Sequence, residues 1–219
     1  MCNFKKAFSI ILSLILTVSF TLLNVHAMGE TRITESIDII DVINNPEKYP
    51  DIKVTVETPY EYINTLKQDK LISPQQREVL INEAQHDLLL RSTTETYSYV
   101  TIKRTVTVTS EYSCYPYFRF KAQTFGGVPA LLVSLNYANI DRAYNGISKQ
   151  FGGTLFVNLD DSTNFYWDLN GDFYNNGTTT GGFSGSINVG NVVNIGFSAS
   201  ETSNHYKYIQ HDENYHFRA

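Results

Sequence analysis

The histidines that could hold a zinc ion are few and widely spaced in this chain. Three histidines, His205, His211 and His216, lie near the C-terminus, where a zinc site would need them to converge. If residues 204–211 form a strand, His205 and His211 share one face but stand about 20 Å apart, at about 3.3 Å per residue. A single strand cannot bring both to one ion, so this spacing predicts no metal site.

The segment from Asp168 to Asp172 begins like a calcium-binding loop, with oxygen-bearing side chains at alternate positions. The pattern then fails, because Phe173 stands where such a loop needs glycine and Thr179 where it needs a bidentate carboxylate. The Asn170-Gly171 pair between apolar flanks instead predicts a tight hairpin turn.

Catalytic signatures are also missing from the sequence. It contains no Gly-x-Ser-x-Gly, no His-Glu-x-x-His and no phosphate-binding loop. A thiol dyad of Cys114 with a histidine, or a carboxylate from Asp160-Asp161 or Asp141, is an alternative without a specific spacing. The sequence therefore predicts a protein that is not an enzyme, with no catalytic residue, no metal and no cofactor.

Aromatic side chains are the most concentrated group that could bind a ligand. Exposed Tyr and Trp rings stack on sugar faces and provide rigid contact area, which suits a glycan or a peptide. The alternative is that these rings fill the core of a β-sheet and its cross-strand pairs. The candidate binding residues are Tyr97, Tyr99, Tyr112, Tyr115, Tyr117 and Trp167.

Residues 182–200 alternate between apolar side chains and small uncharged ones. This alternation is typical of a membrane-inserting β-hairpin, which has lipid on one side and water on the other. We expect a turn at Val189 to Asn191 and arms at residues 182–188 and 192–200. The arms fall short of the roughly nine residues needed to span hydrocarbon, or barely reach it, so an ordinary strand pair is the alternative.

The N-terminus has the pattern of a secretory signal peptide over residues 1–27. Lys5 and Lys6 precede an uncharged run from Ala7 to Val25, and a Val-x-Ala ending at Ala27 has the small residues that a signal peptidase reads. We expect cleavage after Ala27 and secretion, with an uncleaved membrane anchor as the alternative. Cys114 is then the only cysteine, which excludes an intramolecular disulfide and favours burial as a small apolar group.

The net charge and the length of the chain limit which classes of partner and how many domains are expected. The 219 residues include 17 basic and 22 acidic side chains, a net charge of −5, and loss of the two lysines in the signal peptide would make it −7. Negative charge opposes binding to a phosphate backbone, so we expect no nucleic-acid partner. A mature chain of about 190 residues can build one hydrophobic core without disulfides or metals.

Two helices are predicted within an N-terminal segment of residues 28–92. The residues Thr58-Pro59-Tyr60-Glu61 open a helix to about Lys70, and Ser73-Pro74-Gln75-Gln76 open a second to about Leu90. Together they predict a helical hairpin that docks on a sheet, with a removable pro-region or a partner surface as alternatives.

The remainder of that segment gives a weaker pattern. The Asn45-Pro46 pair predicts a single helical turn to about Tyr49. The other residues between 31 and 56 fit neither the helical nor the strand period and receive no assignment.

From Tyr97 onward the pattern changes to alternation. Strands are expected at residues 96–109, 116–124, 128–137 and 153–159, with further Asn-Gly turns at Asn145-Gly146 and Asn176-Gly177. The fold class is therefore mainly β with a small α part. We expect residues 93–219 to form an antiparallel β-sandwich or barrel of about eight to ten strands, preceded by the helical hairpin.

Four segments carry a resemblance to a known group of proteins. Residues 140–146, 148–151, 157–159 and 170–180 resemble segments of small secreted proteins of Gram-positive bacteria, a family of unknown function. The resemblance covers roughly Glu57 to the C-terminus. It implies secretion and a common fold, and it supplies no catalytic residues.

Taken together, these patterns predict a secreted bacterial protein that binds a partner non-catalytically at or outside the cell surface. Its partner would be a cell-wall glycan or a surface protein. The alternative is a membrane-active or bacteriocin-like protein that uses residues 182–200.

Overall fold

The computed structural model describes residues 36–90, 96–175, 178–200 and 204–217. The predicted signal peptide with its cleavage site at Ala27 and the Asn176-Gly177 turn lie outside these residues. In the part of the chain that is described, no helix has the length and apolar character needed to cross a membrane.

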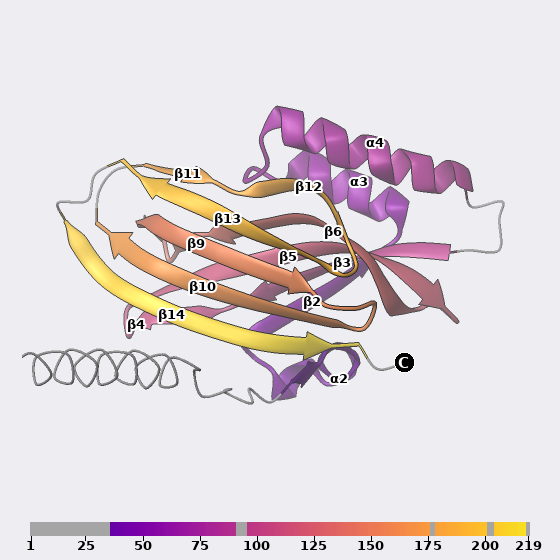
Figure 1. Ribbon diagram of the computed structural model, residues 1–219, viewed down its shortest axis with the longest axis horizontal. Helices are drawn as coiled ribbons and strands as arrows, with labels where there is room; N and C mark the ends of the chain where they lie inside the picture. Colours follow the sequence, from indigo (N-terminus) through magenta and orange to yellow (C-terminus); the bar gives the residue numbers. More distant parts are fainter. Residues whose placement is uncertain (1–35, 91–95, 176–177, 201–203, 218–219) are drawn as a thin grey trace, which may run out of the picture. The chain divides into compact units, whose positions relative to one another are not determined.

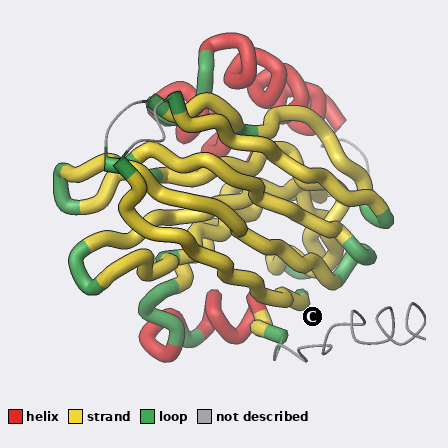
Figure 2. The backbone as a smooth tube through the Cα atoms, turned by 60° about the vertical axis from the view of Figure 1, so that its left-hand side comes forward, coloured by secondary structure: helices red, strands yellow, loops and turns green. Residues whose placement is uncertain are grey.

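Two antiparallel-rich sheets packed against each other make up most of the fold (Figures 1 and 2). Sheet A has the strand order β1-β14-β10-β9-β13-β11, and sheet B has the order β12-β6-β5-β3-β2, with β4 paired to β5. The predicted mainly β class is confirmed. A sandwich or a barrel was expected, and the described strands form two sheets that pack together.

The strands of sheet A are β1 (Ile37–Asp38), β9 (Gln150–Leu159), β10 (Asn164–Tyr174), β11 (Thr179–Gly181), β13 (Asn191–Ala199) and β14 (His205–His216). Sheet B contains β2 (Ile52–Glu57), β3 (Thr96–Arg104), β4 (Val106–Thr109), β5 (Tyr112–Phe125), β6 (Val128–Asp141) and β12 (Phe183–Asn188). The short strands β7 (Ala143–Tyr144) and β8 (Ile147–Ser148) form a hairpin of their own.

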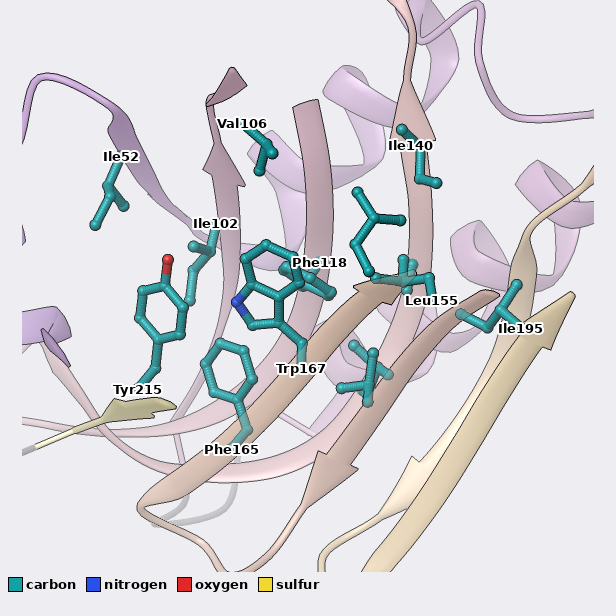
Figure 3. Packing of buried hydrophobic residues seen from close by; sticks show 14 of the residues in the cluster. Ile52, Ile102, Val106, Phe118, Ile140, Leu155, Phe165, Trp167, Ile195 and Tyr215 are labelled. Carbon is teal, nitrogen blue, oxygen red and sulfur yellow. The ribbon is translucent and has the colours of Figure 1, made fainter. Parts of the chain in front are cut away.

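Apolar side chains from both sheets interdigitate to form the main core. Trp167 lies 5.4 Å from Phe118 between ring centroids, and Phe165 stacks on Tyr215 at 5.0 Å (Figure 3). Cys114 is fully buried in the same cluster and is a free thiol, as the sequence predicts. Aromatic rings bury large apolar areas, so this cluster makes a large contribution to the stability of the fold.

Four helical segments precede most of the strands: α2 (Ile39–Asn44), η1 (Pro46–Lys48), α3 (Pro59–Gln68) and α4 (Pro74–Leu90). The predicted caps are present. Thr58 and Glu61 form a reciprocal capping box at α3, and the Gln76 N–H donates to Ser73 Oγ at 3.3 Å at the start of α4. These local contacts explain why both helices begin where the sequence predicts.

The helical pair α3 and α4 covers the face of sheet B that points away from sheet A (Figure 2). Tyr62 of α3 stacks on Tyr99 of β3 with centroids 4.0 Å apart, and Leu80 and Ala84 of α4 are buried in the same cluster. Docking on the sheet is therefore confirmed for the described residues. The second face of sheet B, which alternation alone would assign to solvent, is a second core.

Residues between 31 and 56, left unassigned from the sequence, contribute to both sheets. Ile52 to Glu57 pair with β3, and Ile37 and Asp38 pair with β14 in parallel. Residues on both sides of position 92 thus share one sheet. Only long-range pairing fixes these short strands, which is why the local period did not identify them.

The predicted hairpin turn at Asn170-Gly171 is wrong. Strand β10 runs straight through both residues, and Gly171 lies opposite Gly153 of β9. A Cβ atom on Gly171 would come within 2.5 Å of the Gly152 carbonyl oxygen and 2.7 Å of Phe151 Cζ. The glycine is needed for this close approach and not for a turn. The other turn, Asn145-Gly146, is confirmed, with φ of 48° and 78°.

Residues 182–200 do not form a two-stranded hairpin ladder. Their arms join different sheets, because β12 pairs with β6 whereas β13 pairs with β9 and β11. The apolar positions Ile195 and Phe197 are buried in the main core. The apolar face of this segment therefore packs against the rest of the same chain.

Candidate functional site

Four of the six aromatic residues predicted to bind a ligand are core residues. Tyr99, Tyr112 and Trp167 are at most 1% exposed, and Tyr117 is 4% exposed. Tyr99 and Tyr117 lie under the helical pair, and Tyr112 and Trp167 lie in the main core. Their ring faces are covered, so these four residues do not form an open stacking surface.

The other two, Tyr97 and Tyr115, are half-buried, and each ring faces a lysine ammonium. Lys121 Nζ lies 4.2 Å from the Tyr97 centroid and Lys103 Nζ lies 4.3 Å from that of Tyr115. These cation–π contacts occupy the rings with groups of the same chain. The predicted aromatic binding face is therefore not assembled from the six residues named above.

A different aromatic and polar surface lies on sheet A, on the face that points away from sheet B. We call it the outer face, and no described helix covers it (Figure 1). Because side chains alternate across a strand, the register of β9, β10, β13 and β14 determines its members. They are Thr154, Phe156 and Asn158 of β9; Tyr166, Asp168, Asn170, Asp172 and Tyr174 of β10; Val192, Asn194 and Ser198 of β13; and His205, Tyr208, Gln210, Asp212 and Asn214 of β14.

Aromatic rings stand at both ends of this surface. The Phe156 and Tyr166 rings lie 6.1 Å apart between centroids at an interplanar angle of 57°. Toward the other end of β10, Tyr174 packs edge-on against His205 at 5.9 Å, and Tyr208 is 49% exposed. Tyr166 and Tyr174 are eight residues apart on one strand, which corresponds to about 26 Å.

Hydrogen-bonding groups fill the space between the rings. The Tyr208 hydroxyl donates to Asn170 Oδ1 at 3.1 Å, and His205 Nε2 lies 2.8 Å from Asp172 Oδ1. These cross-strand pairs fix the side chains in an ordered row. The row presents amides and carboxylates, and no lysine or arginine belongs to the outer face of these four strands.

Asp168 lies at the centre of the outer face, directly opposite Asp212 of β14. Its Oδ1 atom is buried and has no hydrogen-bond donor among the described residues. Partial burial, followed by the charge of Asp212, raises the pKa of Asp168 above its ordinary value. A carboxylate held in this way is costly to the fold.

We expect Asp168→Asn to leave the protein at least as stable as the wild type at pH 7. A raised pKa means that the charged carboxylate destabilises the folded state above that pKa, and that the penalty disappears as the pH falls toward the ordinary value of 3.8. Melting temperatures of both proteins, measured between about pH 3 and about pH 7, give the difference in stability. A variant less stable than wild type at pH 7 would contradict this account.

The described residues contain no cluster of three or more metal-ligating side chains. The sequence prediction that His205 and His211 share a face is wrong, because the register of β14 shifts between Phe173 and Tyr174 of its partner strand. His205 contacts Asp172 on the outer face, whereas His211 lies 5.3 Å from Trp167, a ring of the main core. Asp168 and Asp172 lie in an extended strand, so the calcium-like loop is not formed either.

Sequence reasoning missed the outer face because its residues are dispersed over four strands. The signal available was the alternation of β10, in which Tyr166, Asp168 and Asn170 occupy every second position. Which of the two faces meets solvent depends on where the helices dock, and this is a tertiary property.

Comparison of the chain with protein-family models, with curated proteins and with solved structures yields no match.

Proposed function

We propose that this protein is a secreted, non-catalytic glycan-binding protein and that the outer face of sheet A is its binding surface. The observation that carries the proposal is the Asp168 carboxylate, which lies beside the Phe156 and Tyr166 ring pair on the outer face. Asp168 and Phe156 are direct cross-strand neighbours. A sugar offers both complements at once, a hydroxyl donor for the carboxylate and a C–H face for a ring.

The chemistry of the row favours a neutral polysaccharide over other extended ligands. Asp168, Asp172 and Asp212 repel phosphate and other polyanions, and the net charge of the chain acts in the same direction. Carboxylates and amide oxygens accept hydrogen bonds from hydroxyl groups without needing a counter-charge. The length of about 26 Å between Tyr166 and Tyr174 accommodates several sugar units in line.

The proposal is tested by depletion of the mature protein from solution by insoluble cellulose, chitin and purified Gram-positive cell wall. Phe156→Ala and Tyr166→Ala are expected to weaken binding to the polysaccharide that depletes the protein by at least about tenfold each, because aromatic rings that contact a ligand carry a large share of the binding energy. The matched controls are Phe125→Ala and Tyr60→Ala, exposed rings that lie outside the outer face, at 56% and 64% exposure.

Binding that is retained by the two control variants and lost by the two face variants supports the proposal. Equal losses in all four variants would point to nonspecific adsorption through exposed rings and would overturn it. Failure of the wild type to bind any of the three materials would also overturn it. Release of soluble sugar during the assay would contradict the non-catalytic part.

A further inference from the structure

A small cavity lies between the helical pair and sheet B, separated from the outer face by both sheets. Its volume is about 120 Å³, and it is lined by Asp69 and Leu71 of the α3–α4 loop, Thr101 and Lys103 of β3, and Tyr117 and Arg119 of β5. Leu71 is 46% exposed, and Lys103 is also partly exposed, so these two form the solvent-facing rim. Tyr117 and Arg119 are each 96% buried and form the floor.

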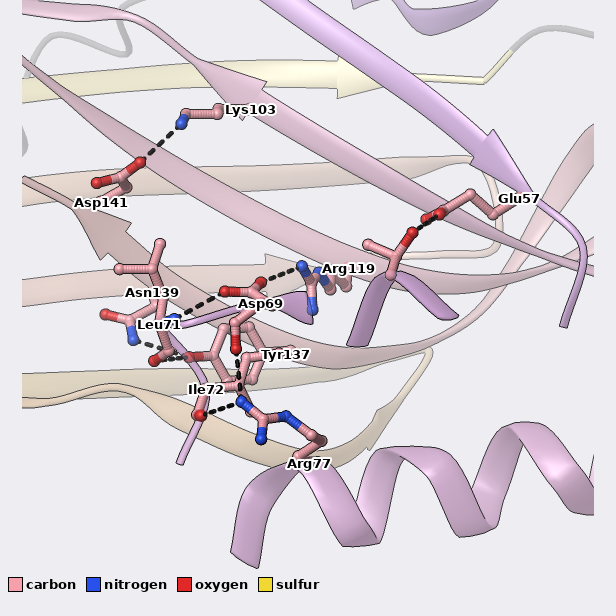
Figure 4. A network of polar contacts seen from close by, with 11 residues as sticks. Glu57, Asp69, Leu71, Ile72, Arg77, Lys103, Arg119, Tyr137, Asn139 and Asp141 are labelled. Atoms are coloured by element: carbon pink, nitrogen blue, oxygen red, sulfur yellow. Dashed lines mark hydrogen bonds and ion pairs between the residues drawn. The ribbon is translucent and has the colours of Figure 1, made fainter. Parts of the chain in front are cut away.

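Arg119 is the unusual group of this cavity (Figure 4). Its Nη2 atom is ion-paired with Asp69, and the rings of Tyr117 and Tyr137 each lie 5.7 Å from its Cζ atom. Its Nε and Nη1 atoms are buried and have no hydrogen-bond partner among the described residues. A buried guanidinium normally uses most of its five N–H groups, so this one has donors to spare.

Several residues that line the cavity hold unpaired polar atoms. Ten buried side-chain atoms lack a partner in the described residues, and four of them belong to lining residues: Thr101 Oγ1, Tyr117 Oη, and Nε and Nη1 of Arg119. Buried polar groups are nearly always hydrogen-bonded in native proteins. Such a concentration around one hollow indicates that its natural occupant is polar and accepts hydrogen bonds.

Charge and volume define that occupant further. Arg119 and Lys103 are each paired with one carboxylate, Asp69 and Asp141, so the site is formally neutral when empty. A monoanion can use the spare Arg119 donors, whereas a dianion such as phosphate would lie too close to Asp69. The volume admits several water-sized groups. We propose that this cavity is a second binding site, for a ligand that carries a single carboxylate.

One spare N–H group of the Arg119 guanidinium can donate to a carboxylate, and the hydroxyls of Thr101 and Tyr117 can donate to it as well. Burial, followed by the neighbouring Tyr137, raises the pKa of Tyr117 well above its ordinary value, so its hydroxyl stays protonated and can donate. The remainder of the ligand leaves the cavity past Leu71 and Lys103. A free organic acid and a peptide C-terminus can each supply this carboxylate, because the lining presents the same chemistry to both.

The test is to titrate the isotope-labelled protein with two probes. Binding is monitored through the NMR chemical shifts of the Thr101 methyl group and the Arg119 Nε–H group. The first probe is sodium propionate. The second is an acetylated dipeptide with a free C-terminus, compared with the same dipeptide as its amide. Thr101→Val and Tyr117→Phe are expected to weaken carboxylate binding about tenfold each, because each removes one hydrogen bond to a charged group.

Both variants should melt at or above the wild-type temperature, because each removes an unpaired buried hydroxyl. Tyr60→Phe changes an exposed tyrosine on α3; it is the matched control and should bind like the wild type.

Tighter binding of the dipeptide than of propionate would identify the natural ligand as a peptide C-terminus. Tighter binding of propionate would identify it as a free organic acid. No shift of either signal with any carboxylate would overturn the proposal, as would unchanged affinity in Thr101→Val and Tyr117→Phe. Tyr166→Ala should retain the carboxylate site, so this proposal and that of the outer face can fail separately.

Discussion

Replacing Glu213 with alanine is expected to lower the free energy of unfolding by about 3–5 kcal/mol. Glu213 is 7% exposed, and its carboxylate accepts from Arg104 Nε at 2.8 Å, from the Tyr215 hydroxyl and from His211. The Arg104 side chain is itself only 16% exposed, and its other partner, Asp51, is 3.6 Å away and largely solvated. Removing Glu213 therefore leaves a buried cation almost uncompensated.

Urea denaturation at pH 7 measures this loss. The double variant Arg104→Met/Glu213→Leu tests whether the unpaired charge of Arg104 is its cause. Because both charges are then absent, the double variant should recover most of the stability. A single variant within about 1 kcal/mol of the wild type would show that the pair is too solvated to matter.

The same carboxylate should give a definite pH dependence. Burial raises the pKa of Glu213, but the hydrogen bonds from His211, Tyr215 and Arg104 together lower it below its ordinary value of 4.5. A lowered pKa means that the contribution to stability is complete above pH 4.5 and is lost as the pH falls through the folded-state pKa. The difference in stability between wild type and Glu213→Gln should therefore shrink on acidification below pH 4.5.

Gly171→Ala is the second substitution with a large expected effect, a loss of about 3 kcal/mol or more. The new Cβ atom would lie 2.5 Å from the Gly152 carbonyl oxygen and 2.7 Å from Gly153 Cα. Both contacts are with backbone atoms, so no side-chain rotation relieves them, and the third contact is with the Phe151 ring in the main core. Strands β9 and β10 would have to move apart.

The matched control is Gly196→Ala in β13 of the same sheet. Nothing lies within 4 Å of a Cβ atom there, and its φ is not positive. Because glycine in a strand costs about 0.5–1 kcal/mol relative to alanine, this variant should be equal to or more stable than wild type. Thermal unfolding of both variants decides the matter, and equal stability of the two would refute the close-approach account of Gly171.

Some of the fold could be predicted because it rests on local contacts. The capping residues Thr58 and Ser73 determine where α3 and α4 begin, and alternation identifies the inward residues Leu155 and Val157 of β9. The hairpin at Asn145-Gly146 needs only its own two residues to adopt positive φ. Each of these features depends on neighbours in the sequence.

Other features depend on partners far along the chain, and local reasoning failed there. Asn170-Gly171 has the composition of a turn, but the need for Gly171 arises from Gly153 on the next strand. Arg104 interrupts an apolar face of β3, and only the fold shows that Glu213, 109 residues away, compensates it.

The candidate site shows the same limit. The sequence drew attention to the density of aromatic residues in β3 and β5, but the helical pair covers the outward tyrosines of these strands, so Tyr99 and Tyr117 are core residues. The rings of the outer face belong to sheet A, and Phe156 and Tyr166 among them are half-buried. The chemistry expected of the rings is retained in the proposal, on a different surface.

The most direct test of the glycan-binding proposal is mapping of backbone amide shifts while a soluble oligosaccharide is added to the mature protein. The oligosaccharide is cut from whichever polysaccharide retains the protein. The account predicts shifts confined to β9, β10, β13 and β14, centred on Phe156, Tyr166 and Asp168, and lost in Tyr166→Ala. Shifts centred on the helical pair or on the turn between β12 and β13 at residues 189–190 would contradict it, because sugar would then bind elsewhere.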